Sequence, residues 1–422
     1  IGFAMKYVGN VQSQANAEVY ATASGTLPNG KAVVVNSDGT VSTITAESEG
    51  FKNPVIFGGN TSGTFTSSTF DSNSNRIVIA YRDASTGYGY AVVGTVNPAN
   101  NTISFGTRVV FESAYALYIA ATFDSNLNKI VIAYQDASNS GYTTSIVGTV
   151  NPANNSISFG TAVVVRSAYA NWVSATFDSN SNKVVITCEQ YAFVGTVSGT
   201  GISFGSQVAF AGALSGVAVD STFDSNSNKV VLAYSRAYNG RAIVGTVSGT
   251  NISFGNEATT ASGGVNAGNA VVFDSNSNKC VVITCPGSGT VSLVGTVSGT
   301  NISFGSAVAI GTIAEFNTLV FDSSTNKIIY FFLDASGGYR AKSKVGTVSG
   351  TSISFTAANS FAPSASTASI SGTFDSTSNK IVMAAGSYEG GYKKAGIYAF
   401  ASTSLTAENY IGITNGAVVS EV

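Results

Sequence analysis

The sequence predicts an all-β protein, built as a seven-bladed β-propeller with four strands in each blade. The first observation is a repeat: the segment Phe-Asp-Ser-Asn-Ser-Asn, or a close variant, occurs seven times along 422 residues. The Asp residues of the seven copies are Asp71, Asp124, Asp178, Asp224, Asp274, Asp322 and Asp375. They are 46 to 54 positions apart, and a period near fifty residues is typical of arrays of one structural unit.

The second observation is that each repeat contains four segments with strand character. The first ends at the Phe-Asp pair, the second is a short apolar run such as 130–134, the third contains Val-Gly-Thr-Val, and the fourth begins with Ile-Ser-Phe. Because the second segment is apolar at consecutive positions, both faces of its sheet must be covered by neighbouring sheets. A propeller covers its blades in this way, and a straight solenoid is the alternative.

The two ends of the chain distinguish a ring from a solenoid. Val-Gly-Thr-Val and Ile-Ser-Phe each occur six times, so the seventh repeat lacks a fourth strand. The segment 51–57 resembles a fourth strand and precedes the first repeat without the other strands. We therefore expect this N-terminal strand to complete the last blade and to close the ring.

Closure of the ring sets the expected domain boundaries. The propeller spans 51–400, an N-terminal β module spans 1–50, and a C-terminal β tail at 401–422 packs near that module. Asp38-Gly39, between two β-rich runs, predicts a hairpin within the module. Because the chain starts at Ile1 rather than Met and ends in β-rich sequence, we expect it to be a piece of a longer protein.

Composition excludes several classes of function. Charged residues make up 10% of the chain and the net charge is −2, so no basic surface for nucleic acid is expected. The chain has no histidine, which removes Ser-His-Asp and Cys-His catalysis and the zinc sites that need histidine. We expect Cys188, Cys280 and Cys285, which lie in or beside apolar runs, to be buried. No apolar run approaches the length of a transmembrane helix, and no cofactor is expected.

The repeated Asp-x-Asn-x-Asn pattern has the spacing of oxygen ligands in a calcium loop. It lacks the glycine and the distal glutamate of such loops in every copy, so each site would have one carboxylate. The alternative is a tight turn in which Asp and Ser form hydrogen bonds with the backbone and Asn adopts the left-handed conformation. We expect the turn and no metal site.

Aromatic residues are concentrated in the connections on one face of the predicted ring. The connections between second and third strands vary in length, and in an up-and-down blade they share a face with the connections between blades. Tyr and Trp dominate contact energies in binding surfaces. The binding candidates are Trp172, Tyr169, Tyr115, Tyr118, Tyr88, Tyr142, Tyr238 and Tyr339. The alternative is that these rings only cover the ends of the blades.

The same connections carry the carboxylates that a glycosidase would need. Asp83, Asp136, Glu189, Asp334 and Glu389 lie there, and two of them could form an acid and base pair. Arginines in these connections resemble the arginine cluster of sialidases, but the Ser-x-Asp-x-Gly-x-Thr-Trp box of that family is absent. Because scattered charges are ordinary in solvated loops, we expect no catalytic residues and no enzyme activity.

The repeats, such as Thr-Phe-Asp-Ser-Asn-Ser-Asn-Lys from Thr222 and Val-Gly-Thr-Val-Ser-Gly-Thr-Asn-Ile-Ser-Phe-Gly from Val244, resemble those of repetitive virion and tail-fibre proteins of marine tailed bacteriophages. The segments Ala23–Asn36 and Leu405–Ala417 resemble parts of the same proteins. The resemblance implies a virion location, with other virion proteins or a host-surface glycan or protein as partners. A secreted cell-surface adhesin or lectin is the alternative, a carbohydrate-active enzyme is the third, and assembly into a homo-oligomer stays open.

Overall fold

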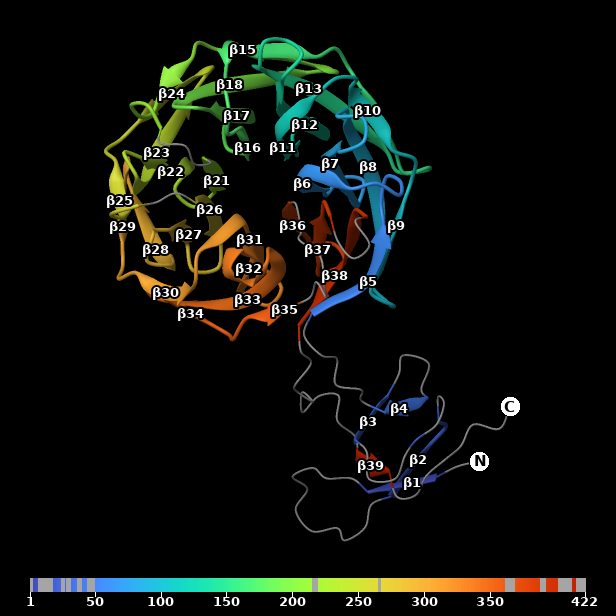
Figure 1. Ribbon diagram of the computed structural model, residues 1–422. Coiled ribbons are helices and arrows are strands. Elements are labelled where there is room, and N and C mark those ends of the chain that lie inside the picture. Colours follow the sequence, from blue (N-terminus) through green and yellow to red (C-terminus); the bar gives the residue numbers. More distant parts are fainter. Residues whose placement is uncertain are drawn as a thin grey trace. The chain divides into compact units, whose positions relative to one another are not determined.

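The structure is a computed structural model that describes residues 3–6, 18–23, 27, 32–35, 40–43, 50–214, 219–264, 267–360, 369–387, 392–400 and 412–414. The chain forms two compact units, one of residues 50–399 and one of residues 1–49 with 400–422. The larger unit is a ring of seven antiparallel sheets (Figure 1). The predicted all-β propeller with seven blades is confirmed.

The strands of each blade follow one another from the centre of the ring outward. The first strands are β6 (Gly63–Asp71), β11 (Ala116–Asp124), β16 (Ser174–Asp178), β21 (Asp220–Asp224), β26 (Ala267–Asp274), β31 (Ala314–Asp322) and β36 (Ile370–Asp375). The second strands are β7 (Arg76–Asp83), β12 (Lys129–Asp136), β17 (Lys183–Cys188), β22 (Lys229–Arg236), β27 (Lys279–Cys285), β32 (Lys327–Asp334) and β37 (Lys380–Ala385). The third strands are β8 (Gly89–Asn97), β13 (Tyr142–Asn151), β18 (Tyr191–Ser198), β23 (Asn239–Ser248), β28 (Thr290–Ser298), β33 (Arg340–Ser349) and β38 (Lys394–Ala399).

The outermost strand of the first six blades is interrupted, so that two short strands pair with the same edge of the third strand. These pairs are β9 (Thr102–Phe105) and β10 (Val109–Glu112), β14 (Ser156–Phe159) and β15 (Val163–Tyr169), β19 (Gly201–Phe204) and β20 (Val208–Ala209), β24 (Asn251–Phe254) and β25 (Ala258–Ala261), β29 (Asn301–Phe304) and β30 (Val308–Gly311), and β34 (Ser352–Phe355) and β35 (Asn359–Ser360). A short 3-10 helix, η1 (Ala335–Gly337), follows β32.

The seventh blade is completed by the N-terminal strand β5 (Gly50–Ile56). Its sheet has the order β36-β37-β38-β5, and the register pairs Tyr398 with Phe51 and Lys394 with Ile56. A shift in register between Ala395 and Ile397 marks a bulge within this pair of strands. The predicted closure of the ring by an N-terminal strand is confirmed.

The second strands form the core because their two faces contact two different blades. Ile77, Val78, Ile79, Ala80 and Tyr81 are all fully buried. Val78 and Ala80 pack in one cluster with β12 of the second blade, whereas Ile77, Ile79 and Tyr81 pack in another with β37 of the seventh. An uninterrupted apolar run is therefore required. Cys188, Cys280 and Cys285 are buried in the same way, as expected.

The repeated Asp residues cap the turns between first and second strands. In the first repeat, a carboxylate oxygen of Asp71 accepts hydrogen bonds from the backbone N–H groups of Asn73 and Ser74, both at 3.0 Å. The Ser74 hydroxyl donates to the other carboxylate oxygen, and Asn75 has a φ of 53°. The same backbone bonds recur at all seven copies. The predicted turn is confirmed.

The smaller unit contains a five-stranded sheet of order β2-β1-β39-β3-β4. Its strands are β1 (Phe3–Lys6), β2 (Glu18–Ala21), β3 (Ala32–Val35), β4 (Val41–Thr43) and β39 (Gly412–Thr414). β3 and β4 pair as the predicted hairpin, and β39, from the C-terminal end of the chain, pairs with β1 and β3. The expected small flanking β module is thus present. Across the described residues, no helix is long and apolar enough to cross a membrane.

Candidate binding site on the loop face

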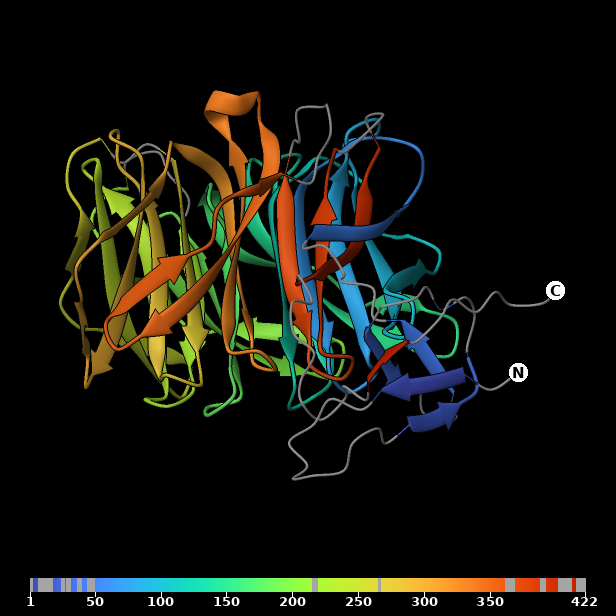
Figure 2. The same cartoon turned by 90° about the horizontal axis from the view of Figure 1, so that it is seen from below.

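The connections that carry the candidate residues lie on one face of the ring. We call this the loop face; it consists of the connections between second and third strands and of those between successive blades. Figure 2, which views the ring from its side, shows the ends of the strands gathered at two opposite faces. Backbone hydrogen bonds from Ala116 to Gly87 and from Ala170 to Gly141 join the two kinds of connection. The candidate tyrosines and Trp172 are therefore presented toward one side.

We call the repeated Asp that caps each turn between first and second strands the turn Asp. In four of the seven repeats, an aromatic residue with left-handed backbone lies six positions before the turn Asp. These residues are Phe65, Tyr118, Trp172 and Phe316, with φ values of 52°, 47°, 56° and 50°. In β6, β11 and β31 the pairing register shifts at this position, so the residue occupies a β-bulge. Such a conformation costs about 1–3 kcal/mol for a bulky side chain and is found preferentially at functional sites.

Three of these rings form a continuous row, which we call the aromatic arc: Phe65, Tyr118 and Trp172. The ring centroids of Phe65 and Tyr118 are 5.1 Å apart, and those of Tyr118 and Trp172 are 4.9 Å apart, with interplanar angles of 59° and 58°. The arc thus spans the first three blades: Phe65 and Tyr118 lie in β6 and β11, and Trp172 lies two residues before β16. All three side chains are half-buried.

The exposed tyrosines Tyr115 and Tyr169 lie beside the arc. Each ring packs over a glycine of the preceding connection: a Cβ on Gly87 would stand 2.7 Å from the Tyr115 ring, and one on Gly141 would stand 2.4 Å from the Tyr169 ring. The guanidinium of Arg82 is 5.2 Å from the centre of the Phe65 ring and 5.6 Å from that of Tyr115. Aromatic surface therefore continues outward from the arc.

The other candidates are distributed over the loop face. Tyr88, Tyr238 and Tyr339 are exposed and belong to the first, fourth and sixth blades, and Tyr142 is half-buried at the start of β13. The loop position expected from the sequence is wrong for Tyr118, Tyr142 and Tyr169. Strand pairing extends further than the repeat motif indicates, so these three residues lie within β11, β13 and β15. Phe65 and Phe316 were not among the predicted candidates, although their shared distance from the turn Asp marks them.

Polar groups adjoin the arc at Tyr118 and Trp172. The backbone N–H of Asn171 donates to Oε1 of Glu189 at 2.8 Å, and the N–H of Glu189 donates to the Asn171 carbonyl at 3.1 Å. Gln135 holds this pair by donating to the Ala170 carbonyl and to Oδ1 of Asn171. Burial raises the pKa of Tyr118, and the nearby Tyr169 and Glu189 raise it further, so its hydroxyl is neutral at physiological pH.

The carboxylates considered for catalysis are engaged in structural contacts. Oδ1 of Asp136 accepts from the hydroxyl of Ser138 and from backbone N–H groups of its own turn. Asp334 forms an ion pair with Lys342 at 2.5 Å. Glu189 is held by Asn171, and Glu389 lies outside the described residues. No group of three or more metal-binding side chains is found within the described residues.

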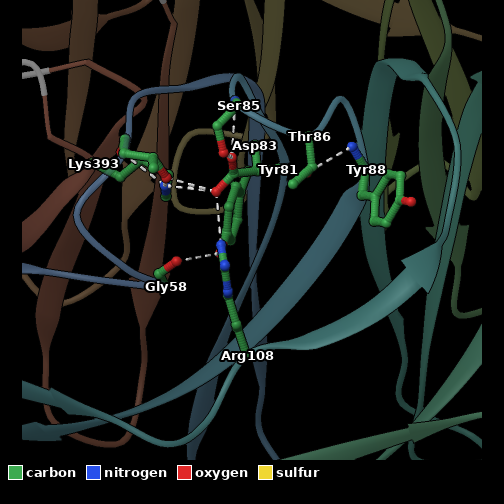
Figure 3. Close-up of polar contacts among 9 residues, drawn as sticks. Gly58, Tyr81, Asp83, Ser85, Thr86, Tyr88, Arg108 and Lys393 are labelled. Atoms are coloured by element: carbon green, nitrogen blue, oxygen red, sulfur yellow. Dashed lines mark hydrogen bonds and ion pairs between the residues drawn. The ribbon is translucent and has the colours of Figure 1, made fainter.

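Asp83 belongs to a buried network at the seam between the first and seventh blades (Figure 3). Its Oδ2 accepts from Arg108 at 2.7 Å and from Thr61 at 2.6 Å, and Nζ of Lys393 lies 3.3 Å away. Lys393 and Asp83 are fully buried, and Lys393 also donates to the hydroxyl and carbonyl of Thr61. Burial would raise the pKa of Asp83, but hydrogen bonds from Ser85, Thr61 and Arg108 hold it well below its usual range.

Comparison with known proteins adds information about the fold. No family model and no curated protein matches the sequence. A protein from Lactobacillus plantarum has a TM-score of 0.53 at 11% identity, covering 86% of this chain and 97% of that chain. A Bacteroides uniformis protein, named as a candidate 6-phosphogluconolactonase, has a TM-score of 0.54 at 10% identity, with 85% and 96% covered. A chain of the Kuenenia stuttgartiensis hydrazine synthase has a TM-score of 0.55 at 7% identity, with 84% and 100% covered. These similarities show the fold alone.

Proposed function

We propose that this chain is a non-catalytic recognition protein of a virion, which binds a host-surface receptor or another virion protein through its loop face. The observation that carries the proposal is the aromatic arc of Phe65, Tyr118 and Trp172, whose left-handed backbone conformation is costly. The fold does not require an aromatic residue there, since Gly268 and Ser369 occupy the same position in the fifth and seventh blades. Residues that adopt a strained backbone conformation which the fold does not require are expected at binding sites.

A binding role without catalysis agrees with the chemistry of the loop face. Asp83, Asp136 and Asp334 are engaged in an ion pair or in capping their own turn, which leaves them unsuited as a general acid and base. The low share of charged residues, 10%, suits a displayed surface that recognises its partner by shape and aromatic contact. The virion location is supported by the resemblance of the repeats to tail-fibre proteins, and a cell-surface adhesin is the competing location.

The location is tested by immunogold electron microscopy of the source material with antibodies against the whole chain. Gold on phage particles is expected, and gold confined to cell envelopes would overturn the virion assignment in favour of the adhesin.

The binding face is tested by attachment of the purified chain to cells or particles from the same source. We expect Trp172→Ala to weaken attachment by about 2 kcal/mol or more, as at an interface hot spot. Leu127→Ala is the matched control, because Leu127 is an exposed apolar residue on the opposite face, in the turn after Asp124. Equal attachment of both variants would contradict the proposal.

Trp172 also packs against the apolar core between the third and fourth blades, so the melting temperature is measured on the same samples. A variant that is destabilised yet still attaches would show that Trp172 only covers the blade.

A further inference from the structure

We propose that the aromatic arc, together with the Glu189–Asn171 pair, is a subsite for a neutral carbohydrate, in which a pyranose ring stacks on Tyr118 and Trp172. The inference rests on the proposed function and names the ligand class of its binding face. Ligand sites of this kind combine aromatic walls with a few placed polar groups. The first three blades bring both features together.

The arrangement of the rings favours a flat ligand. Tyr118 contacts both Phe65 and Trp172, with centroid separations of 5.1 and 4.9 Å. Rings this close leave no room for a group between them, so the arc is a folded surface rather than a cage around a cation. The apolar face of a pyranose presents C–H bonds that suit the electron-rich face of an aromatic ring.

The charges beside the arc favour a neutral ligand. Arg82 lies 5.2 Å from the Phe65 ring centre at one end and would repel a cation there. Glu189 lies at the other end, beside Tyr118 and Trp172, and would repel an anion. A polyhydroxylated ligand without net charge avoids both penalties.

Glu189 has hydrogen-bonding capacity left for such a ligand. Its Oε1 accepts from the backbone N–H of Asn171, and among the residues that the structure describes none donates to Oε2. A carboxylate oxygen accepts hydrogen bonds from hydroxyl groups, and charged acceptors form the stronger bonds. Glu189 itself has a φ of 50°, so its backbone is held in an uncommon conformation next to the arc.

The experiment uses the intrinsic fluorescence of Trp172, which is the single tryptophan of the chain. The whole 422-residue chain is titrated with neutral oligosaccharides of glucose, galactose, mannose and N-acetylglucosamine, and its attachment to source cells is measured before and after periodate oxidation of their glycans. We expect a saturable change in emission with at least one oligosaccharide and a loss of attachment after periodate.

Glu189→Gln is the decisive variant, because the amide keeps the Oε1 acceptor for Asn171 but loses the charge. It should weaken oligosaccharide binding at least tenfold with an unchanged melting temperature, and Leu127→Ala should bind like the parent protein. Attachment that survives periodate and depends on Trp172 would overturn the carbohydrate subsite while leaving the proposed function intact. Attachment that depends on neither Trp172 nor Glu189 would overturn both.

Discussion

Single residues of the inner strands show where this fold accepts unfavourable local conformations. The residue six positions before the turn Asp is aromatic and has a left-handed backbone in the first, second, third and sixth blades. Gly268 and Ser369 occupy the same position in the fifth and seventh blades. Ser369 there accepts a hydrogen bond from Thr66 of the first blade. The ring therefore also closes with small residues at this position, so the core contacts that Phe65 and Trp172 make are not required in every blade.

Asp220 is the residue for which we predict a pH effect on stability. It lies in β21, where its carboxyl accepts from the backbone N–H groups of Val271 and Ser221, both at 2.9 Å. Burial raises its pKa from 3.8 to about 6 despite these hydrogen bonds. Because the folded-state pKa lies above the unfolded value, the stabilising contribution is complete below pH 3.8 and is lost as the pH rises through about 6.

Asp220→Asn should remove this dependence, since the amide does not titrate, but it should lose one of the two backbone hydrogen bonds at every pH, because the amide has one acceptor oxygen instead of two. A shift of roughly two pKa units corresponds to about 3 kcal/mol at most, so the difference in stability between the variant and the parent should move in favour of the variant by up to that amount between pH 4 and pH 7. Denaturant unfolding at pH 4, 5, 6 and 7 measures the difference. Parallel pH profiles for the two proteins would show that Asp220 does not titrate in this range.

At the scale of an element, the turn between the first and second strands is the most regular part of each repeat. The turn Asp is buried, and its carboxylate accepts two backbone N–H groups that would otherwise lack a partner. Since this carboxylate is occupied by protein donors, the turn has a structural purpose in every blade.

We predict that Asp274→Ala destabilises the protein by about 2 kcal/mol, because it leaves the N–H groups of Asn276 and Ser277 without their acceptor. Asp274→Asn is the matched control, since its amide oxygen can still accept and its loss should be smaller. Chemical denaturation of both variants gives the values. An alanine variant as stable as the parent would mean that water replaces the carboxylate at no cost.

Glycine contacts between neighbouring blades set how closely these elements pack. Gly160 follows Ile-Ser-Phe, and a Cβ there would stand 1.9 Å from the carbonyl oxygen of Thr200 in the next blade. Gly205 and Gly255 meet Thr250 and Thr300 in the same way. The glycine of the repeated Ile-Ser-Phe-Gly segment is therefore required by the approach of the next blade, not by its own strand.

For the whole molecule, the seam between the seventh and first blades is where the ring must be held closed. The pairing of β5 with β38 and the buried network of Lys393, Asp83, Arg108 and Thr61 are among the interactions that act there (Figure 3). Lys393 and Asp83 are 310 positions apart, so the network forms only when the ring is complete.

Lys393→Met should destabilise the ring by about 3 kcal/mol or more, because Asp83 and the Thr61 carbonyl lose a buried donor. Adding Asp83→Asn should cost less than the sum of the two single changes, since Lys393 and Asp83 interact directly, although Arg108 then also loses its ion-pair partner. Unfolding free energies of the two single variants and the double variant measure the coupling. Strictly additive losses would show that the two groups do not interact.

Removal of residues 1–59 takes away β5 and should leave the edge of β38 unpaired. An exposed strand edge promotes aggregation or exchange of strands between copies, so we predict that the shortened chain is insoluble or domain-swapped. Size-exclusion chromatography with light scattering and thermal melting test this. A stable monomer with the parent melting temperature would contradict closure by β5.

The architecture can be predicted from the sequence alone, because the information that specifies it is local and repeated. Seven Phe-Asp turns, apolar second strands and six rather than seven Ile-Ser-Phe segments were enough to predict the blade count and the closing strand. These features depend on hydrogen bonds within a turn, on alternation of side chains along a strand, and on a count of strands. Each of them can be seen without knowing which distant residues meet.

The candidate site depends on contacts that form only in the folded ring. The sequence predicted an aromatic loop face and named Tyr118 and Trp172, but it did not place their rings 4.9 Å apart or include Phe65 in the same row. These contacts join residues about fifty positions apart, and the bulges that turn the rings depend on pairing with the second strand. Lys393 meets Asp83 for the same reason: closing a ring brings together side chains whose separation along the chain carries no signal of their contact.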